Sequence, residues 1–555
     1  MKRFYSICIF LLLIGETFTG MAAEWQWSVR IPSMISQETE AHPQAFLWIP
    51  AGCKRVKAVA VGQHNMCEET LFENPVFRRR MQEAGIALVW ITPILDFPWN
   101  VNTGCNDALL TALDSLAETS GYDELKVVPI VPVGHSAMAT FPWNFAAWNP
   151  ERALAVISYH GDAPRTNLTG YGGANLEWGR TRNIDGIPGL MVEGEYEWWE
   201  ARVNPALAFR MMYPESCISF LCDTGRGHFD VADRTADYIG LFLKKAVEYR
   251  IPADTDWNKP VALKKLNPRD GWLAERWRTG TKEPQGEVRP ARLAKQPRRA
   301  NPAPYLQYKQ YKGDRHDAFW YFDREMAELT EECYRQEHDL LPQYVSFMQE
   351  GELVPYTPQS HVTLSARFLP EADGVTFHLK AVYTDSLRAS LTDGHSAAVP
   401  RIERICGPVK QVNDTTFVLD FYRMGTTNKK RTPSITLVAS AGGDRQYKEC
   451  VQELSFNIPY PLTEGRRQCI LFPGIGDVKA GTESVTLDAT SDCGLPVYYY
   501  VKEGPAEIRG NKVIFTKIPP RSRYPLKVTV VAWQYGISGK VQTAEPVERT
   551  FFIVE

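Results

Sequence analysis

A serine that follows a strongly β-forming run is the residue of this sequence best suited to covalent chemistry. The segment Val131–Ala139 reads VPVGHSAMA, and Ser136 stands two residues after Gly134. The run Val127–Val133 predicts a strand and the residues after Ser136 predict the start of a helix, which is the strand–turn–helix setting of a nucleophile elbow. Gly134 is expected where strand and helix leave no room for a side chain. We therefore expect the Ser136 hydroxyl to project above the end of a strand as a nucleophile.

One position departs from the usual form of such an elbow. A second glycine normally stands two residues after the serine, and Met138 takes that place here. Ala137 and Ala139 on either side of it are small. We therefore expect a local rearrangement around Met138.

A serine hydroxyl is a weak nucleophile until a base removes its proton, and His228 is the best placed base. It stands in GRGHFD (Gly225–Asp230), after the apolar run Ile218–Cys222 and before a helical pattern. The two glycines before His228 allow the loop to bend and present the imidazole. The base is also expected to come last in chain order in this type of site.

The other histidines of this region suit the role of base less well. His135 is next to Ser136 and is expected to face away from it, whereas His64 comes too early in the chain. His160 ends a predicted strand, where we expect it to act as a polar cap.

A carboxylate between Ser136 and His228 would hold the imidazole in the required tautomer. The segment Ile187–Arg202 predicts a strand and its loop. It carries four glutamates, namely Glu193, Glu195, Glu197 and Glu200. Asp162, at the end of the preceding predicted strand, is a further candidate.

The order Ser136, Glu197, His228 resembles the α/β-hydrolase superfamily, over roughly residues 40–250. The resemblance implies Glu197 as the acid, because it stands three residues after the glycine that ends the strand; Glu195 is the second choice and Asp162 the third. It also implies acyl transfer through a covalent acyl-serine, with no metal and no organic cofactor. The sequence accords with this, since it has no HExxH motif and no Cys or His cluster with the spacing of zinc ligands.

The same resemblance implies an oxyanion hole made of two backbone N–H groups. One is expected from Ala137, directly after the nucleophile. The other is expected from the loop Gly62–Glu69 (GQHNMCEE), which stands where many relatives carry His-Gly-x. His64 and Asn65 occupy the His-Gly places, so Met66 is the expected donor.

Alternating apolar runs and helical patterns must position these residues, and they predict a mostly parallel α/β sheet with helices on both faces. The predicted strands are 56–61, 86–91, 127–133, 153–159, 190–192 and 218–222, and the predicted helices are 72–84, 107–118 and 232–249.

The rest of the chain predicts further domains, as 555 residues exceed what one core usually serves. Residues 251–354 are expected to form a connector with helices over 317–336 and on to Glu350. Residues 355–460 predict a β-rich domain, with strands over 361–368, 375–382 and 416–421. Residues 465–555 resemble a bacterial immunoglobulin-like β-sandwich, carried by ILFP (Ile470–Pro473), ATSDCGLPVYYY (Ala489–Tyr500) and Val528–Trp533.

The N-terminus predicts export to the periplasm or the extracellular space. Residues 1–22 have a basic start, an apolar stretch centred on Ile9–Ile14 and a small-x-small cleavage site at Gly20 and Ala22, so they predict a signal peptide followed by the catalytic region 23–250. No later run is long enough to span a membrane.

A net charge of −3 gives no reason to expect a nucleic-acid partner. Export permits disulfides such as Cys217–Cys222 or Cys406–Cys450, but sequence does not fix the pairing.

The layout of export signal, hydrolase, β-rich region and many tryptophans is similar to secreted carbohydrate esterases of gut bacteria, among them pectin methylesterases with the α/β-hydrolase fold. The segments carrying this resemblance are GQHNMCEE, GHSAMATFPWN and GEYEWWEAR. It implies a carbohydrate ester substrate, with uronate carboxylates that favour nearby arginines: Arg165, Arg180, Arg202 and Arg226. Tryptophans 90, 99, 143, 148, 178, 198 and 199 would suit sugar rings, although core packing is their commoner role. A glycan deacetylase and a non-catalytic carbohydrate-binding protein are the alternatives.

Overall fold

The computed structural model describes residues 24–166, 176–197, 200–278, 300, 302–337, 339–356, 364–422, 428 and 431–555. The predicted signal segment 1–22, together with Trp198 and Trp199, lies outside these residues.

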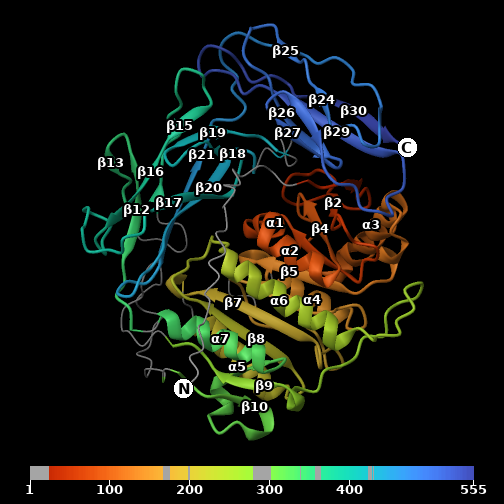
Figure 1. Ribbon diagram of the computed structural model, residues 1–555, viewed down its shortest axis with the longest axis vertical. Coiled ribbons are helices and arrows are strands. Elements are labelled where there is room, and N and C mark those ends of the chain that lie inside the picture. The colour runs from red at the N-terminus through yellow and green to blue at the C-terminus, as the bar shows by residue number, and fades with distance from the viewer. Residues whose placement is uncertain are drawn as a thin grey trace, which may run out of the picture.

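An eight-stranded sheet forms the centre of the first part of the chain (Figure 1). Its order is β1-β2-β4-β3-β5-β6-β7-β8. The strand β2 pairs antiparallel with both β1 and β4, and all other neighbours pair parallel. This order and its single reversed strand are those of the α/β-hydrolase fold. The strands are β1 (Trp27–Arg30), β2 (Gln44–Trp48), β3 (Ala58–Gln63), β4 (Ile86–Thr92), β5 (Ile130–His135), β6 (Val156–Tyr159), β7 (Pro188–Gly194) and β8 (Cys217–Asp223).

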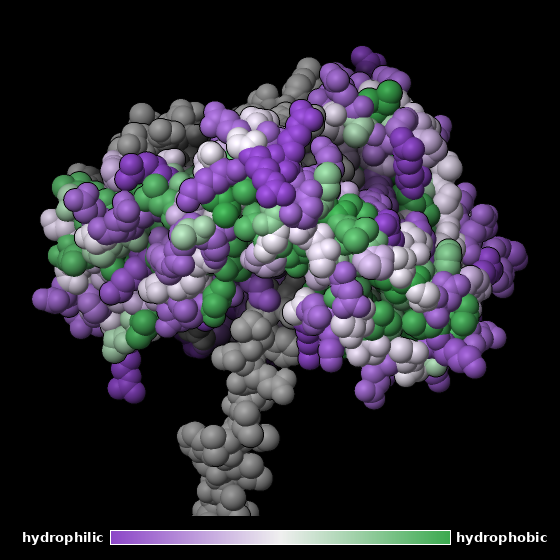
Figure 2. Space-filling model, turned by 90° about the horizontal axis from the view of Figure 1, so that it is seen from above, coloured by the Kyte–Doolittle hydropathy of each residue, from purple (hydrophilic) through white to green (hydrophobic). Residues whose placement is uncertain are grey.

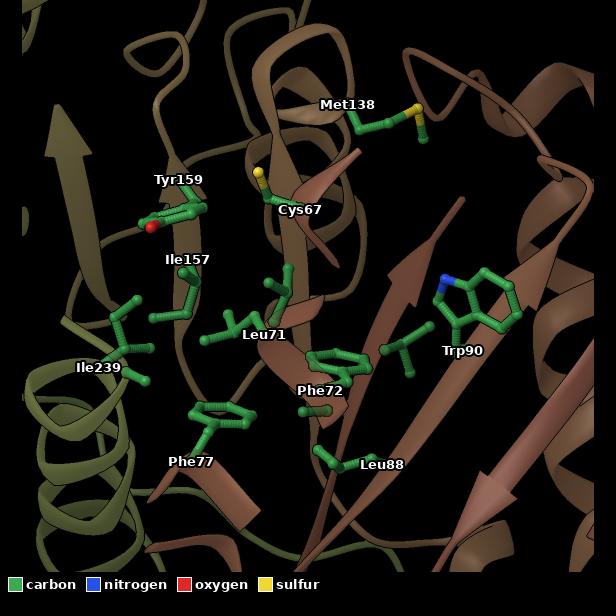
Figure 3. Packing of buried hydrophobic residues seen from close by; sticks show 14 of the residues in the cluster. Cys67, Leu71, Phe72, Phe77, Leu88, Trp90, Met138, Ile157, Tyr159 and Ile239 are labelled. Atoms are coloured by element: carbon green, nitrogen blue, oxygen red, sulfur yellow. The ribbon is translucent and has the colours of Figure 1, made fainter. Parts of the chain in front are cut away.

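Six α-helices accompany this sheet, and the strands from β2 to β8 are buried almost throughout because helices and loops cover them. Figure 3 shows Phe72, Phe77 and Ile239 meeting side chains of the sheet such as Leu88 and Ile157. The helices are α1 (Cys67–Glu73), α2 (Pro75–Ala84), α3 (Cys105–Ser120), α4 (Thr140–Trp148), α5 (Glu200–Met212) and α6 (Asp233–Arg250).

The helix predicted over 72–84 is divided in the structure, and the cause is local. Asn74 caps α2, since its side chain accepts hydrogen bonds from the N–H groups of Val76 and Phe77 at 2.9 and 3.0 Å. Pro75 follows at the first helical position, where its missing N–H costs nothing. The chain therefore ends α1 before Asn74 and starts a new helix after it.

The turn after β5 depends on small residues. A Cβ at Gly134 would lie 2.1 Å from the carbonyl oxygen of Met138, so no side chain fits there. Met138 itself is fully buried. A Cβ at Gly161 would lie 1.9 Å from the Cβ of Ala139, so the close approach between this turn and the segment after β6 is made one residue beyond Met138.

The segment after α6 contains more strand than we predicted. A three-stranded sheet, β10-β9-β11, precedes α7 (Arg324–Glu337), and the next segment, predicted as helix up to Glu350, is the strand β12 (Tyr344–Gln349). It pairs with β16, so these residues belong to the β-rich region. Pairing with β16 and the burial of the consecutive residues Val345, Ser346 and Phe347 in this sheet outweighed the helical pattern. The strands are β9 (Trp272–Glu275), β10 (Tyr305–Gln307), β11 (Ala318–Tyr321), β13 (Glu352–Leu353) and β16 (Lys380–Thr384).

Two further sheets make up the β-rich region, with orders β14-β21-β20-β17 and β15-β19-β18. Their strands are β14 (Leu364–Ser365), β15 (Thr376–His378), β17 (Arg401–Cys406), β18 (Val409–Gln411), β19 (Thr416–Leu419), β20 (Ser434–Ala441) and β21 (Cys450–Asn457).

Residues 465–555 form small sheets that contact the first part of the chain. Trp25 bridges to Gly504, and Arg521 pairs with buried Glu124 at 2.8 Å. The immunoglobulin-like character of this region stays a prediction. The strands are β22 (Ile470–Leu471), β23 (Val478–Lys479), β24 (Ser484–Thr486), β25 (Thr490–Ser491), β26 (Tyr498–Glu503), β27 (Ala506–Arg509), β28 (Lys512–Phe515), β29 (Leu526–Trp533) and β30 (Val547–Val554).

Figure 2 shows polar and apolar side chains interspersed over one face of the molecule. Among the described helices, none has the length and apolar character required to cross a bilayer.

The described cysteines, including the Cys217, Cys222, Cys406 and Cys450 considered for disulfides, are free thiols. Four of the tryptophans predicted near the site (Trp90, Trp99, Trp143 and Trp178) are core residues, at most 1% exposed.

A chain that ends at Arg250 is expected to aggregate when purified. It would expose Phe220 of β8, which stacks on Phe319 at 4.9 Å between ring centroids, and would lose the bond from Tyr321 Oη to the Phe220 carbonyl (2.6 Å). Size-exclusion chromatography and near-ultraviolet circular dichroism, with the chain starting at Ala23 and ending at Glu555 as control, measure this. A monomeric, folded product ending at Arg250 would contradict it.

Candidate functional site

Ser136 stands directly after β5 in a strained backbone conformation. Its φ is +52°, in the left-handed region that non-glycine residues rarely adopt. The strain is sustained because the sheet and the following turn fix the residues on both sides. The conformation lifts the side chain above the carboxyl end of the sheet, as the elbow pattern predicts.

His228 meets Ser136 across this edge of the sheet. Its Nε2 lies 2.8 Å from Ser136 Oγ, and its Nδ1 makes a short hydrogen bond to Glu197 Oε2. His135 faces away from Ser136, as expected, and its Nε2 donates to the His228 carbonyl at 2.9 Å. The structure therefore brings together the three predicted residues in one hydrogen-bonded chain, with the imidazole in the middle.

Glu197 lies in the short 3-10 helix Glu195–Glu197 that follows β7, and several donors hold it. Gly194 N–H donates to its Oε1 at 3.2 Å, and Arg202 Nη1 donates to its Oε2 at 3.2 Å. The residue is buried. Such a carboxylate can orient the imidazole and stabilise it when it becomes charged.

The two other candidate acids are occupied elsewhere. Glu195 points away from His228: its Oε1 pairs with Lys448 Nζ at 2.6 Å and its Oε2 accepts from Gly225 N–H at 3.0 Å. Asp162 Oδ1 lies 3.8 Å from Arg202 Nε. Of the three predicted acids, the structure therefore places only Glu197 against His228.

Two residues that support Glu197 were not recognised from the sequence. His160, which we expected to cap a strand, has a φ of +50° after β6, and its Nδ1 lies 2.5 Å from Glu197 Oε1. Arg202 was considered only as a substrate contact, but its side chain is fully buried beneath the same carboxylate. The SYHGD run was the only local signal, because it places a histidine at the end of the strand beside β7.

Burial and charge act in opposite directions on the pKa values of this chain of residues. Burial alone would raise the pKa of Glu197, but His228 and His160 beside it hold that pKa well below 4.5. Burial lowers the pKa of His228 below 6.5 and outweighs the raising effect of Glu197. At neutral pH the imidazole is therefore neutral and can accept a proton from Ser136.

The predicted oxyanion donors differ in how they are placed. Ala137 follows Ser136 directly, so its N–H lies beside the nucleophile. The N–H of Met66 donates to Glu68 Oε2 at 3.1 Å, so Met66 can serve an oxyanion only by sharing or releasing that bond. Burial raises the pKa of Glu68 to about 8, and its Oε1 accepts from His135 N–H at 2.8 Å. A neutral Glu68 next to this position leaves the negative charge of an oxyanion unopposed.

His160, Glu197 and His228 also form a group in which one possible metal-ligand atom of each residue lies within 4.8 Å of the others. A cation bound there would have to replace the hydrogen bond between His228 and Glu197. Because His228 already bridges Ser136 and Glu197, the arrangement fits proton transfer better than metal ligation.

Comparison with known proteins finds distant structural likeness only. No protein-family model and no curated protein matches the chain. The similar solved structures include an esterase from Pyrobaculum calidifontis (15% identity, 40% of this chain and 85% of that chain, TM-score 0.29). Another is Est1E from Butyrivibrio proteoclasticus (15% identity, 40% of this chain and 99% of that chain, TM-score 0.27). A third is an S-formylglutathione hydrolase from Agrobacterium tumefaciens (14% identity, 40% of this chain and 94% of that chain, TM-score 0.29). These likenesses are too distant to identify a reaction.

Replacing Glu197 separates the role of this carboxylate from that of its neighbour. Glu197→Gln is expected to lower kcat on an ester substrate by on the order of 10³- to 10⁴-fold, because the amide favours the wrong imidazole tautomer and does not stabilise the imidazolium. Glu195→Gln, the matched control two residues away, is expected to cost less than about ten-fold, since Glu195 does not contact His228. Steady-state kinetics of both folded variants measure this. Equal losses would mean that Glu197 is not the acid.

The pH profile is expected to have a limb on each side of neutrality. Activity should rise as His228 loses its proton, with a midpoint below 6.5, and fall near pH 8 as Glu68 ionises beside the developing oxyanion. Glu68→Gln should remove the alkaline limb alone, and Glu69→Gln, next to it on α1, should retain both. An alkaline limb that persists in Glu68→Gln would assign it to another group.

Proposed function

We propose that this protein is an exported serine carboxylic-ester hydrolase that acts on a plant-type polysaccharide or oligosaccharide, with pectin methyl esters as the first candidate substrate. The observation that carries the proposal is the hydrogen-bonded chain from Ser136 through His228 to buried Glu197, with Ser136 in a strained turn. Activation of a serine by this arrangement is the recurrent basis of acyl transfer.

The proposed reaction has two steps. Ser136 Oγ attacks the ester carbonyl while His228 takes the hydroxyl proton; the oxyanion collapses and His228 returns that proton to the departing alcohol. Water then attacks the acyl-serine with His228 as base, releasing the acid and restoring Ser136. With a methyl-esterified uronate, methanol departs first and the sugar acid is the acyl group. With an acetylated sugar, the sugar hydroxyl departs and acetate is released last.

Positive charge near the loop Gly62–Glu69, the oxyanion loop, supports an acidic sugar as the substrate. Of the arginines predicted for this role, Arg202 is buried under Glu197 and Arg226 pairs with Glu449 at 2.9 Å and Asp230 at 3.3 Å. Arg404 and Arg431 of the β-rich region are better placed.

Both of these arginines adjoin the oxyanion loop. Arg431 Nη1 lies 4.0 Å from Met66 Sδ, and Arg404 Nη2 lies 3.9 Å from Glu69 Oε2. Both are ion-paired, Arg431 with Glu38 and Arg404 with Glu69, but each side chain is about one quarter exposed (23% and 25%), so both retain contact with solvent. Their charges, after burial, also lower the pKa of His64 in the same loop. A uronate next to the scissile ester would be attracted here.

Release of methanol and acetate from methylated and acetylated pectic oligosaccharides distinguishes the candidate functions. Methanol from the wild type and none from Ser136→Ala is the expected result. Ser115→Ala, at a partly exposed position of α3, serves as the control serine variant. A chelator should leave the rate unchanged. Acetate in place of methanol would favour the glycan deacetylase. Binding of the oligosaccharides without release of either product, unchanged in Ser136→Ala, would favour a carbohydrate-binding protein.

A further inference from the structure

One buried carboxyl group of the β-rich region reaches the loop that carries His228. Glu453 lies on β21, is 3% exposed, and its Oε1 accepts hydrogen bonds from the N–H groups of His228 (2.8 Å) and Phe229 (3.3 Å). Both residues stand in the loop between β8 and α6. Glu453 supplies a fixed acceptor at the backbone of the proposed base.

The glycines of the GRGHFD loop make room for this contact. A Cβ at Gly227 would lie 2.1 Å from Glu453 Oε1, and a Cβ at Gly225 would lie 2.4 Å from Glu449 Cγ. Gly225 has a φ of +74°, which also favours glycine, whereas Gly227 is constrained by Glu453 itself. The two glycines therefore allow a strand from another part of the chain to approach the His228 loop closely.

The residues before Glu453 bind the loop that carries Glu197, next to the start of β21. Lys448 pairs with Glu195 at 2.6 Å, and the Glu449 carbonyl accepts from Tyr196 Oη at 2.8 Å. Glu449 also pairs with Arg226 at 2.9 Å. Residues 448–453 thus contact both loops whose side chains must meet at the imidazole.

The edge strand β17 of the same sheet contacts the oxyanion loop and the helix α1 that follows it. Cys406 Sγ, at the end of β17, lies 3.8 Å from Met66 Sδ, and Thr70 Oγ1 donates to the Ile405 carbonyl. Because β17 and β21 are both hydrogen-bonded to β20, one sheet links the loops that present base, acid and oxyanion donor. Figure 1 shows these strands beside the parallel sheet.

We propose that Glu453 is a positioning residue for the reaction. The β-rich region would then contribute to catalysis by holding the loop that carries His228. Glu453 acts through the backbone of His228 and holds the imidazole within reach of Ser136. The inference rests on the proposed function, because it concerns the same base. A displacement of about 1 Å in a catalytic group costs about 100-fold in rate, so a missing anchor at His228 has a direct kinetic effect.

An oxygen atom rather than a negative charge is the feature of Glu453 that matters. Burial raises the pKa of Glu453 to about 7, so the group loses much of its charge near neutrality, and Asp230 nearby raises that pKa further. Both forms keep an oxygen that accepts from the two N–H groups. Glutamine has such an oxygen and nearly the same shape, whereas alanine has neither.

The test compares Glu453→Ala and Glu453→Gln in the full chain. Glu453→Ala is expected to lower kcat for ester cleavage by about 10- to 100-fold with KM within about two-fold of the wild type, and to slow the reaction of Ser136 with an organophosphonate by a similar factor. Glu453→Gln is expected to retain kcat within about three-fold. Glu503→Ala removes a glutamate that is similarly buried (4% exposed) on β26, far along the chain, and should lower stability without changing kcat.

Substitution of Gly227 provides a second route to the same contact if Glu453→Ala does not fold. Gly227→Ala places a methyl group against Glu453 Oε1 and should reduce kcat similarly. Where Glu453→Ala does fold, the double variant should show no further loss, because both changes remove one interaction.

Two different failures can be told apart. Folded Glu453→Ala or Gly227→Ala protein with wild-type kcat and labelling rate would overturn the positioning role while leaving the esterase intact. Equal loss of kcat in Glu453→Gln and Glu453→Ala would also overturn it, since the glutamine keeps the acceptor. A wild-type protein that neither reacts with the phosphonate nor cleaves an ester would overturn the proposed function, and the inference with it.

Discussion

The burial of the Glu197 carboxylate is the constraint on which the rest of the site depends. A buried charge is costly unless it is paired and hydrogen-bonded. Here two histidines, one arginine and one backbone N–H surround it. These donors come from the ends of β6, β7 and β8 and from α5, so satisfying one carboxylate brings four neighbouring segments to one point. The geometry of His228 relative to Ser136 follows from this convergence.

His160 gives this arrangement a second imidazole that does not reach the serine. Its Nδ1 and that of His228 meet opposite oxygens of Glu197. The extra imidazole lowers the pKa of Glu197, which burial alone would raise. A carboxylate that stays ionised can stabilise an imidazolium, so buried His160 contributes to the electrostatics of the site through Glu197.

The second half of the chain is bound to the first by polar contacts at the site and by contacts far from it. Residues 448–453 hold the loops after β7 and β8, whereas Arg521 reaches buried Glu124 on the side of the first strands. Buried polar pairs between two regions fix their relative position more strictly than apolar packing, because a shifted partner leaves an unsatisfied group. The β-rich region and the terminal sheets thus hold loops of the eight-stranded sheet in place through these polar contacts.

The sequence alone determined the strands from β3 to β8, the helices α2, α3 and α6, the turn at Ser136 and the loop of His228, whereas β1, β2 and α5 were not predicted. Those features depend on local patterns: apolar runs of strand length, helical periodicity, and glycines where the backbone must bend. Tertiary structure decided which of two nearly adjacent glutamates meets the imidazole, since Glu195 is taken by Lys448, 253 residues away. It also decided the roles of His160 and Glu453 and turned residues 344–349 into strand, because each of these outcomes depends on a partner distant in the sequence, which no local pattern records.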